Sequence, residues 1–212
     1  MEWVGGDQVI VMTSDNSGGI GEKPLDEVKV PYDMVAYYAF RTALMDCFSA
    51  GAVPVSVVIH NFCGDAAWTK LESGVKQGLA EIGADAAITG STESNMTLQQ
   101  SAVAVTVIGE RVRDFSEVSG PLEWSLAGKP LVGMEVVEEA ADVAPLSLAR
   151  SYVDDPSVAV IWPAGSKGIA AEWMRMCEQL VIDAQIPDFS VDVNKSAGPA
   201  TCWIVGRRSA VD

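Results

Sequence analysis

The first half of the chain alternates between short runs of β-branched apolar residues and longer stretches in which apolar residues recur every three or four positions. The first pattern is typical of strands and the second of amphipathic helices. The predicted strands are 8–13, 53–61, 86–89 and 101–109. One predicted helix begins at Pro31 and stops at Gly51, and the other covers 68–82 and is ended by Gly83.

The second half continues this mixture after a polar stretch. Its predicted strands are 130–134, 158–162 and 200–205, and its predicted helices are 144–152 and 169–184. We interpret 111–128 as a connection between two domains, 1–110 and 129–212. The order of the elements predicts a mixed α/β (α+β) fold class in two unequal parts.

Composition narrows the class of protein. With 212 residues, 49% of them hydrophobic, the chain can bury a core, and we expect no disorder. No apolar run approaches the ~20 residues of a membrane span, and no signal peptide opens the chain, so we expect a cytoplasmic protein with no membrane partner. The formal net charge of −15 argues against a nucleic-acid partner, because phosphate backbones attract basic surfaces. A small-molecule substrate remains compatible with this charge.

The cysteines and the histidine offer little chemistry. Cys47, Cys63, Cys177 and Cys202 are widely spaced, lie in apolar sequence and form no C-x-x-C pair, so we expect buried, reduced thiols. His60 is the sole histidine of the sequence and ends a strand-like run without a nucleophile motif nearby. We interpret it as structural, which argues against a Ser-His-Asp triad.

The motif richest in candidate chemistry is T-S-D-N-S-G-G-I-G-E-K at 13–23, which follows the first predicted strand. Glycines let backbone N–H groups approach an anion, and a neighbouring carboxylate such as Asp15 can hold a divalent cation. The alternative is a turn aspartate at the end of the strand that bonds its own backbone. On the functional interpretation, the nucleotide and phosphate ligands of this segment are Asp15, Asn16, Gly18, Gly19 and Gly21.

A second acid, Asp46, lies in the otherwise apolar segment L-M-D-C-F-S-A-G-A-V-P. Helical spacing puts it on one face with Val35 and Ala39, where a charge is costly unless it is paired or bound to a metal. A metal ligand and a structural charge are therefore both open at this position.

The second half contains two further glycine turns, P-A-G-S-K-G at 163–168 and N-K-S-A-G-P at 194–199. We call them the Lys-Ser-Gly turns. The first stands between a predicted strand and a helix start, where free N–H groups favour an anion, although it is not a Walker A motif. Each turn alone is more often a loop, but two of them in a chain with only 14 basic residues favour phosphate contacts. The candidate ligands are Gly165, Ser166, Lys167, Lys195 and Ser196.

These segments resemble the AIR synthase-related superfamily. G-G-I-G-E-K at 18–23 is similar to the D-G-V-G-T-K turn of aminoimidazole-ribonucleotide synthetase. L-M-D-C-F-S-A-G-A-V-P is similar to the S-D-L-A-A-M-G-A-x-P segment of thiamine-monophosphate kinase, and T-G-S-T-E at 89–93 stands where the superfamily commonly has G-G-D-T. Within the superfamily the chain most resembles α-ribazole kinase, an enzyme of cobamide (cobalamin) salvage. The phrases S-G-G-I-G-E-K, V-K-V-P, P-A-G-S-K-G-I and K-S-A-G-P-A-T-C carry that likeness.

The resemblance implies an N-terminal α/β domain that forms a homodimer through its strands and holds ATP and Mg²⁺ near the dimer interface. It also implies a shortened α+β C-terminal domain that contributes substrate and phosphate contacts. Matched by motif, Asp15 and Asp46 are the metal ligands and Lys23 lies near the phosphates. The acid of G-G-D-T is replaced by Ser91, so Glu93 is the candidate that takes over its metal role.

From this resemblance we expect an ATP- and Mg²⁺-dependent kinase, a transferase with a small alcohol as acceptor, and α-ribazole is the leading substrate. Its expected catalytic residues are Lys23, Asp46 and Lys167. Two alternatives stay open. One is an ATP-dependent ligase or cyclase of the same superfamily, and the other is a non-catalytic nucleotide-binding sensor, which Ser91 favours.

Overall fold

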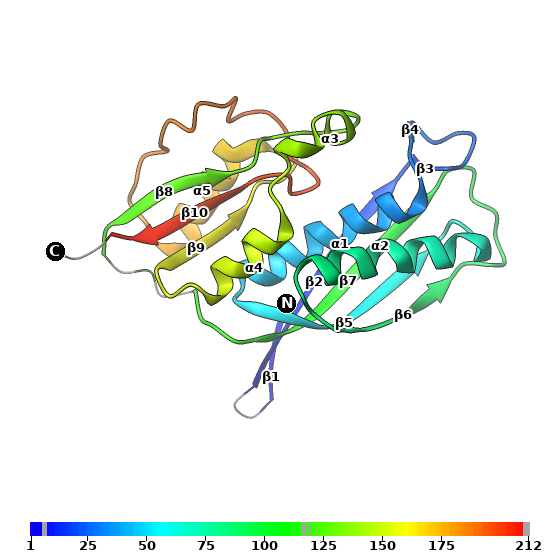
Figure 1. Cartoon of the computed structure of the whole chain (residues 1–212), viewed down its shortest axis with the longest axis horizontal. Helices are drawn as coiled ribbons and strands as arrows, with labels where there is room; N and C mark the ends of the chain where they lie inside the picture. Colours follow the sequence, from blue (N-terminus) through cyan, green and yellow to red (C-terminus); the bar gives the residue numbers. More distant parts are fainter. Residues whose placement is uncertain (6–7, 116–117, 119, 210–212) are drawn as a thin grey trace. The chain divides into compact units, whose positions relative to one another are not determined.

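The computed structural model describes residues 1–5, 8–115, 118 and 120–209 (Figure 1). The chain forms two compact units. The first comprises Met1–Cys47 and Ala52–Arg111, and the second comprises Phe48–Gly51 and Val112–Asp212. In both units strands and helices are mixed, as the sequence predicts.

A five-stranded sheet with the order β1-β2-β7-β5-β6 forms the first unit. Its strands are β1 (Glu2–Gly5), β2 (Gln8–Gly18), β5 (Ala52–Asn61), β6 (Ala87–Thr92) and β7 (Ala102–Arg111). Neighbouring strands are antiparallel except β5 and β6, which run parallel. A parallel pair needs a crossover connection, and the helix α2 lies within it.

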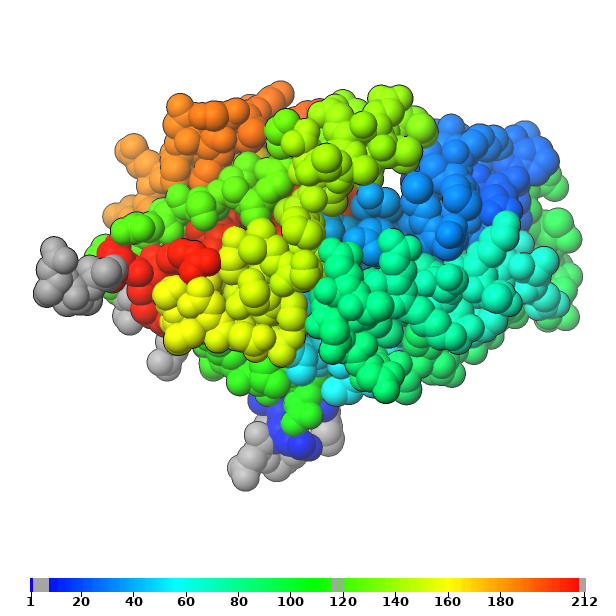
Figure 2. Space-filling view, viewed as in Figure 1, coloured from blue at the N-terminus to red at the C-terminus, as the bar shows by residue number. Residues whose placement is uncertain are grey.

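Two helices, α1 (Tyr32–Ser49) and α2 (Trp68–Glu81), cover one face of this sheet, and the short η1 (Asp65–Ala67) precedes α2 (Figure 1). Val103, Val105 and Val107 of β7 are buried on the covered face. The Tyr37 hydroxyl of α1 donates to the Glu81 carboxylate of α2 over 2.7 Å, which joins the two helices. The outer side of α2 lies on the surface in Figure 2.

Part of the opposite face of the sheet, on the paired segments of β2 and β7 near Ser14, carries small, uncharged side chains. On β7, Ala102, Ala104 and Thr106 are half-buried, and on β2, Ser14 and Asn16 are exposed. The hydroxyls of Ser14 and Thr106 lie 3.0 Å apart across the two strands. We call this surface the open sheet face.

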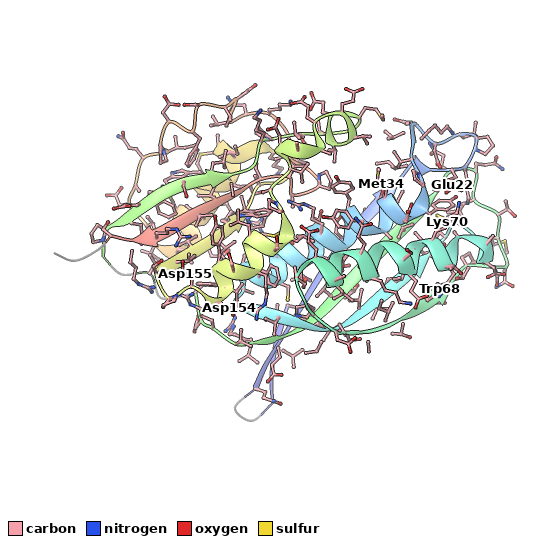
Figure 3. All side chains as sticks on the ribbon, viewed as in Figure 1. Glu22, Met34, Trp68, Lys70, Asp154 and Asp155 are labelled. Atoms are coloured by element: carbon pink, nitrogen blue, oxygen red, sulfur yellow. The ribbon has the colours of Figure 1, made fainter. Side chains whose placement is uncertain are left out.

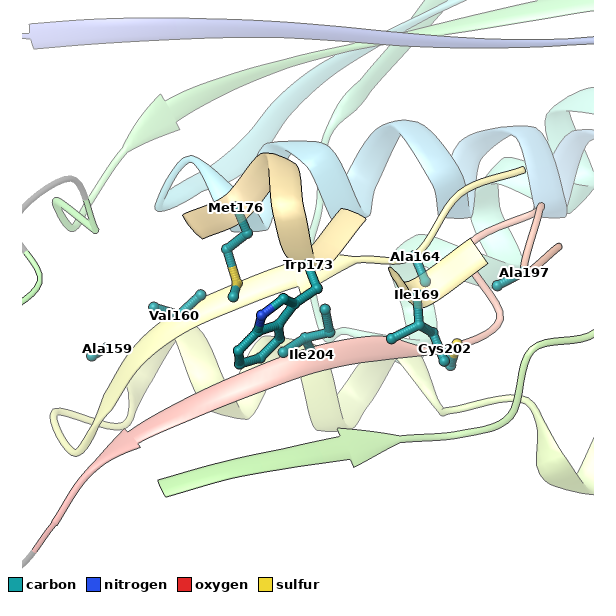
Figure 4. Packing of buried hydrophobic residues seen from close by; sticks show 9 residues of the cluster. All are labelled: Ala159, Val160, Ala164, Ile169, Trp173, Met176, Ala197, Cys202 and Ile204. Carbon is teal, nitrogen blue, oxygen red and sulfur yellow. The ribbon is translucent and has the colours of Figure 1, made fainter. Parts of the chain in front are cut away.

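The second unit has a three-stranded antiparallel sheet with the order β8-β10-β9. Its elements are β8 (Leu122–Ala127), α3 (Glu135–Glu138), η2 (Ala140–Asp142), α4 (Leu146–Asp154), β9 (Val158–Pro163), α5 (Gly168–Leu180) and β10 (Trp203–Arg208). In its core, Trp173 and Met176 reach from α5 toward the sheet, where Ile204 of β10 lies (Figure 4). Trp124 packs edge-on against Trp173 with the ring centroids 4.8 Å apart.

Gly51, predicted to end the first helix, does so with φ +72°, and its N–H donates to the Phe48 carbonyl over 2.9 Å. The Gly51 carbonyl then accepts the N–H groups of Val112 and Arg113 at 2.9 and 3.0 Å. A Cβ at this position would lie 1.9 Å from the Arg113 carbonyl oxygen, so only glycine fits. These bonds explain why Phe48–Gly51 belongs to the second unit.

Three sequence predictions of elements in the second unit are wrong. The segment 130–134 is not a strand, and β8 lies inside the stretch 111–128 that we interpret as a connection. The alternation of Leu122, Trp124 and Leu126 with polar residues is a strand pattern that the surrounding polar sequence obscures. The predicted helix 169–184 ends early, because Val181 adopts a left-handed conformation with φ +54°. Positions 116, 117 and 119 of the predicted connection lie outside the described residues.

Other structural features bear on the expectations for membrane and thiol chemistry. In the part of the chain that the structure describes, no helix has the length and apolarity needed to cross a bilayer. All four cysteines are thiols, and Cys47 and Cys202 are buried whereas Cys63 and Cys177 are half-buried. His60 is exposed on β5, on the same side as the open sheet face by its alternation with buried Ile59.

Candidate nucleotide and phosphate site

Asp15 lies within β2, because the strand continues to Gly18. Its register partner is Val105 of β7. The side chain is half-buried, and this burial raises the pKa of its carboxyl although hydrogen bonds from the Asn16 backbone and the Thr42 hydroxyl oppose the shift. The prediction that Asp15 ends the strand is therefore wrong. β7 pairs with the polar residues S-D-N-S as readily as with the apolar ones before them.

Asp46 is exposed in the last part of α1. Val35 and Ala39, which share its face by helical spacing, are buried, so the prediction of a charge on a buried face is wrong. Spacing identifies residues that share a face, but what covers that face changes along the helix. Burial, and after it the negative charge of Asp46, raise the pKa of the Cys47 thiol to about 12, so this thiol is inert near neutral pH.

Thr42 is the common neighbour of the two predicted metal ligands. Its hydroxyl bonds the Asp15 carboxylate, and it lies four residues before Asp46, the spacing that places two side chains on one side of a helix. Asp15 and Asp46 are thus both related to Thr42, one by a hydrogen bond and the other by helical spacing, and a shared role in binding a metal stays a prediction. Mg²⁺ commonly takes one or two carboxylates and completes its shell with phosphate and water oxygens, so each acid stays a candidate ligand.

Glu93, the third predicted metal ligand, follows β6 and holds a turn. Its carboxylate accepts the backbone N–H groups of Asn95 and Met96 at 2.7 and 3.0 Å. Among the described residues no three Asp, Glu, His or Cys side chains gather as a metal site, so Glu93 is not grouped with Asp15 and Asp46. A role for Glu93 in binding a metal stays a prediction.

The glycine turn (18–23) leaves β2 and enters two short paired strands, β3 (Ile20–Gly21) and β4 (Val28–Lys29). The Gly19 N–H donates to the Ser101 carbonyl over 2.8 Å, so one amide that the sequence assigns to phosphate already has a protein partner. Gly21 has φ +150°, and a Cβ there would lie 2.7 Å from both the Ser101 hydroxyl and the Tyr32 ring. Gly18 and Asn16 are exposed.

The ammonium group of half-buried Lys23 bonds to the protein backbone. The group donates to the backbone carbonyls of Phe62, Leu98 and Gln100 at 3.1, 3.0 and 3.3 Å. A lysine ammonium has three N–H donors, so these contacts use all of them. To contact a phosphate, as the sequence predicts, Lys23 must exchange a carbonyl for a phosphate oxygen.

The neighbouring Glu22 forms an exposed ion pair with Lys70 of α2 (Figure 3). The Lys70 ammonium lies 2.7 and 2.8 Å from the two carboxylate oxygens, and the Tyr32 N–H donates to the same carboxylate over 3.2 Å. The hydrogen bond from Lys70 is the main reason that the pKa of Glu22 is lowered. The pair links the glycine turn to α2 on the surface.

In the second unit the two Lys-Ser-Gly turns lie side by side. The Ala197 N–H donates to the Gly165 carbonyl over 3.1 Å, and a Cβ at Gly198 would lie 3.8 Å from the Ser166 nitrogen. Residues about thirty positions apart in the sequence are thus neighbours in space. This juxtaposition is the strongest structural support for a shared role of the two turns.

The basic residues of these turns lie toward solvent. Lys167 is exposed and immediately precedes α5. Lys195 pairs with Glu135 of α3 over 2.9 Å, and about a third of each side chain is exposed. A phosphate can replace the carboxylate of such a partly exposed pair at little cost, because solvent screens exposed ion pairs strongly.

The sequence reasoning missed an acid at this location. Glu172 of α5 accepts the indole N–H of Trp162 over 3.0 Å, and its other oxygen lies 3.4 Å from the Cβ position of Gly165. Its side chain is only 16% exposed. Glutamate is common in the early part of a helix because the helix dipole favours it. Nothing in the sequence therefore distinguishes Glu172 as a residue of the site.

Comparison with known proteins identifies the fold. No family model matches the chain, and no curated protein does. The hydrogenase maturation protein HypE, in its complex with HypF, matches with a TM-score of 0.65 and 12% identity over 98% of this chain and 77% of that one. Thiamine monophosphate kinase from Aquifex aeolicus matches with a TM-score of 0.58 and 13% identity over 96% and 80%. The chain has the AIR synthase-like fold.

A further HypE structure, in complex with ATP, matches with a TM-score of 0.60 and 9% identity over 94% of this chain and 69% of that one. The predicted fold class is confirmed by these likenesses. At such low identity they establish the fold alone. The assignment of individual residues to ATP, Mg²⁺ or substrate stays a prediction.

Proposed function

We propose that the protein is an ATP- and Mg²⁺-dependent kinase that phosphorylates a small alcohol, with α-ribazole as the leading acceptor. The observation that carries the proposal is the acid pair Asp15 and Asp46 around Thr42 on an AIR synthase-like fold. One solved structure of this fold is a thiamine monophosphate kinase and another is a complex with ATP. The resemblance to α-ribazole kinase in the glycine turn and in both Lys-Ser-Gly turns supports the choice of acceptor.

In the proposed mechanism Asp46 and Asp15 would hold Mg²⁺, which would supply positive charge that offsets the triphosphate. Asp46 is exposed, whereas burial raises the pKa of Asp15 against two hydrogen bonds that lower it, so the ionised Asp15 carboxylate carries a desolvation cost. A cation beside Asp15 would offset that cost. The acid pair therefore fits the group that it is proposed to hold.

The Lys-Ser-Gly turns supply the phosphate contacts in this proposal. The hydroxyls of Ser166 and Ser196 donate to phosphate oxygens, and the ammonium groups of Lys167 and Lys195 offset the charge of the transition state. Phosphoryl transfer depends mainly on positioning and electrostatics, so the mechanism needs no histidine base. It also does not require Lys23, whose ammonium is bound to three carbonyls.

We further propose that the protein is a homodimer that associates through the open sheet face. Small side chains such as Ala104 and Thr106, half-buried on the central strand β7, allow two sheets to approach closely. Light scattering tests this: Ala104→Arg should convert a dimer into a monomer, and the same mass for both proteins would refute the interface.

The test of the function is ADP formation with Mg-ATP and α-ribazole, with thiamine monophosphate and a blank without acceptor as controls. Turnover that requires α-ribazole supports the kinase and its substrate. Turnover with thiamine monophosphate instead would replace the acceptor and keep the reaction class.

A non-catalytic nucleotide-binding sensor is the second candidate. Ser91, in exposed β6, stands where the superfamily motif has an acid. When Lys23 is matched to the lysine of D-G-V-G-T-K, Gly18 occupies the position of that motif's aspartate, so this chain also lacks that acid. Tight Mg-dependent ATP binding without ADP formation for any alcohol would favour this candidate.

A further inference from the structure

Asp26 is a buried acid that the sequence did not single out. The residue is 5% exposed, and its carboxylate accepts three hydrogen bonds. Oδ1 accepts the Ser101 N–H at 2.6 Å, and Oδ2 accepts the Ser101 hydroxyl at 2.7 Å and the Lys23 N–H at 2.8 Å. A buried carboxylate is stable only when its acceptors are satisfied in this way.

The surroundings of Asp26 are equally ordered. Ser101 is 1% exposed, and its hydroxyl lies 3.0 Å from the hydroxyl of Tyr32, which is 6% exposed. Burial alone would raise the pKa of Asp26, but the bonds from Ser101 and from the Lys23 backbone outweigh it and lower the pKa. The carboxylate is therefore ionised when it holds the turn.

The Lys23 ammonium ties the same turn to other segments. Its carbonyl partners belong to Phe62, directly after β5, and to Leu98 and Gln100, directly before β7. The Gln100 side-chain amide donates to the Leu25 carbonyl over 2.8 Å. The main chain and the side chain of Lys23 thus bond to different groups, and both hold the turn against the sheet.

Lys29 completes the set of contacts. Its ammonium donates to the carbonyls of Lys23 and Pro24, the latter over 2.8 Å. Both basic residues of this loop are therefore bound to backbone oxygens. A glycine-rich loop without such contacts would lose its freedom only when a ligand binds, whereas here that freedom is lost on folding.

We propose that Asp26 is a positioning residue for the glycine turn, and that the Lys23 ammonium acts with it as a structural clamp instead of as a direct phosphate ligand. The clamp holds the backbone of 18–23 in one conformation at the end of β2, the strand that carries Asp15. Its consequence for nucleotide affinity rests on the proposed function, whereas its effect on the turn does not.

Amide hydrogen exchange of the ligand-free protein tests the clamp directly. In Asp26→Asn the new amide N–H₂ meets the donors of Ser101 or Lys23, so we expect exchange in 18–27 to accelerate about tenfold or more. Lys23→Met, which keeps the length of the side chain, should accelerate exchange in the same segment. Ser101→Ala is a milder variant that removes a single donor, and Lys76→Met, which breaks an exposed pair with Glu72 within α2 and away from the turn, is the matched control.

Coupling between the two residues is the decisive comparison. If Asp26 and Lys23 hold one turn, the double variant should accelerate exchange in 18–27 by less than the product of the two single accelerations. Exchange in the buried part of β7 should stay at the wild-type rate. An unchanged turn in Asp26→Asn, or faster exchange throughout the unit, would overturn the proposal.

Binding of a non-hydrolysable ATP analogue with Mg²⁺, measured by calorimetry, separates the two roles of Lys23. The clamp predicts that Asp26→Asn and Lys23→Met weaken binding by similar factors, about tenfold each. Weaker binding in Lys23→Met with unchanged exchange would make Lys23 a phosphate ligand and refute the clamp. If the wild-type protein binds no nucleotide, the proposed function fails, and the exchange data still decide whether the clamp exists.

Discussion

The glycine turn of the first unit and the Lys-Ser-Gly turns of the second are held in different ways. The first is tied down by charged side chains, since Asp26 and Lys23 both bond to backbone groups. The second pair is held by the backbone, through the bond from Ala197 to the Gly165 carbonyl. In the glycine turn the charged side chains bond to the backbone and maintain the fold. In the Lys-Ser-Gly turns the lysine side chains stay accessible to solvent.

This difference shows that a lysine in a glycine-rich turn can have either of two roles. Lys23 and Lys167 look alike in sequence, yet the ammonium of Lys23 has three carbonyl partners and Lys167 is exposed. A lysine with all its donors bound contributes to stability and geometry, whereas an exposed one can contact a ligand. Site residues should therefore be judged by the partners they already have.

The largest expected effect concerns Asp46, the exposed acid of the first unit. Asp46→Asn should lower turnover by about 100-fold or more, because it removes a charge proposed to hold Mg²⁺. The melting temperature should stay close to that of the wild type, since the side chain is exposed. Asp85→Asn, at another exposed acid of the same unit, is the control. An active Asp46→Asn enzyme would remove the metal assignment.

The next effect tests how tightly the glycine turn is packed. Gly21→Ala should destabilise the protein by about 3 kcal/mol, because the new Cβ meets the Ser101 hydroxyl and the Tyr32 ring at 2.7 Å. Gly18→Ala is the matched control, since no atom lies within 4 Å of its Cβ position. Urea denaturation measures both variants. Equal stability of the two would show that the turn is looser than its contacts indicate.

A smaller effect is expected for the accessible lysines of the second unit. Lys167→Met and Lys195→Met should each raise the KM for ATP about tenfold, as expected for a lost charge-assisted contact, without lowering the melting temperature. Lys76→Met, at an exposed lysine of α2, serves as the control. If the KM is unchanged in both variants, the contrast between structural and accessible lysines loses its functional meaning.

The smallest effect is a pH dependence in the second unit. Hydrogen bonds, first from Arg207 and then from Ser157, lower the pKa of Asp155 from 3.8 to about 2. The folded state therefore binds fewer protons than the unfolded one between these values. The contribution of Asp155 to stability is present above about pH 4 and is lost as the pH falls toward 2.

Acid unfolding followed by tryptophan fluorescence checks this expectation. Asp155→Asn should flatten the loss of stability between these two pH values, whereas Asp154→Asn, at the neighbouring residue (Figure 3), should not. The same slope in both variants would show that the bond between Asp155 and Arg207 does not contribute.

The sequence predicted the fold well where one local pattern determined the structure. The strands around β5 and β7 and the helices α1 and α2 have strong periodicity and clear glycine stops, and all four were found close to their predicted bounds. β8 was missed because only three apolar residues mark it. The extension of β2 through Asp15 was missed because pairing with β7, which is distant in sequence, stabilises polar residues as a strand.

The candidate site was harder to predict because burial and partners depend on tertiary structure. The two Lys-Ser-Gly turns do lie side by side, but the roles of their residues and of Asp15 and Asp46 stay predictions, and the sequence misjudged the burial of Asp46. Asp26 has no distinguishing neighbours in sequence, since its main partner, Ser101, lies 75 residues away. No local pattern could reveal a buried carboxylate of this kind.

The position of Phe48–Gly51 affects how the chain can be made and divided. These residues emerge from the ribosome with the first unit, but the Gly51 carbonyl bonds to Val112 and Arg113, which are synthesised much later. These two hydrogen bonds can therefore form only after the downstream residues have been synthesised. A chain cut after Arg111 would leave that carbonyl without these partners, so the two units are not independent modules that evolution or the laboratory could exchange at a single junction.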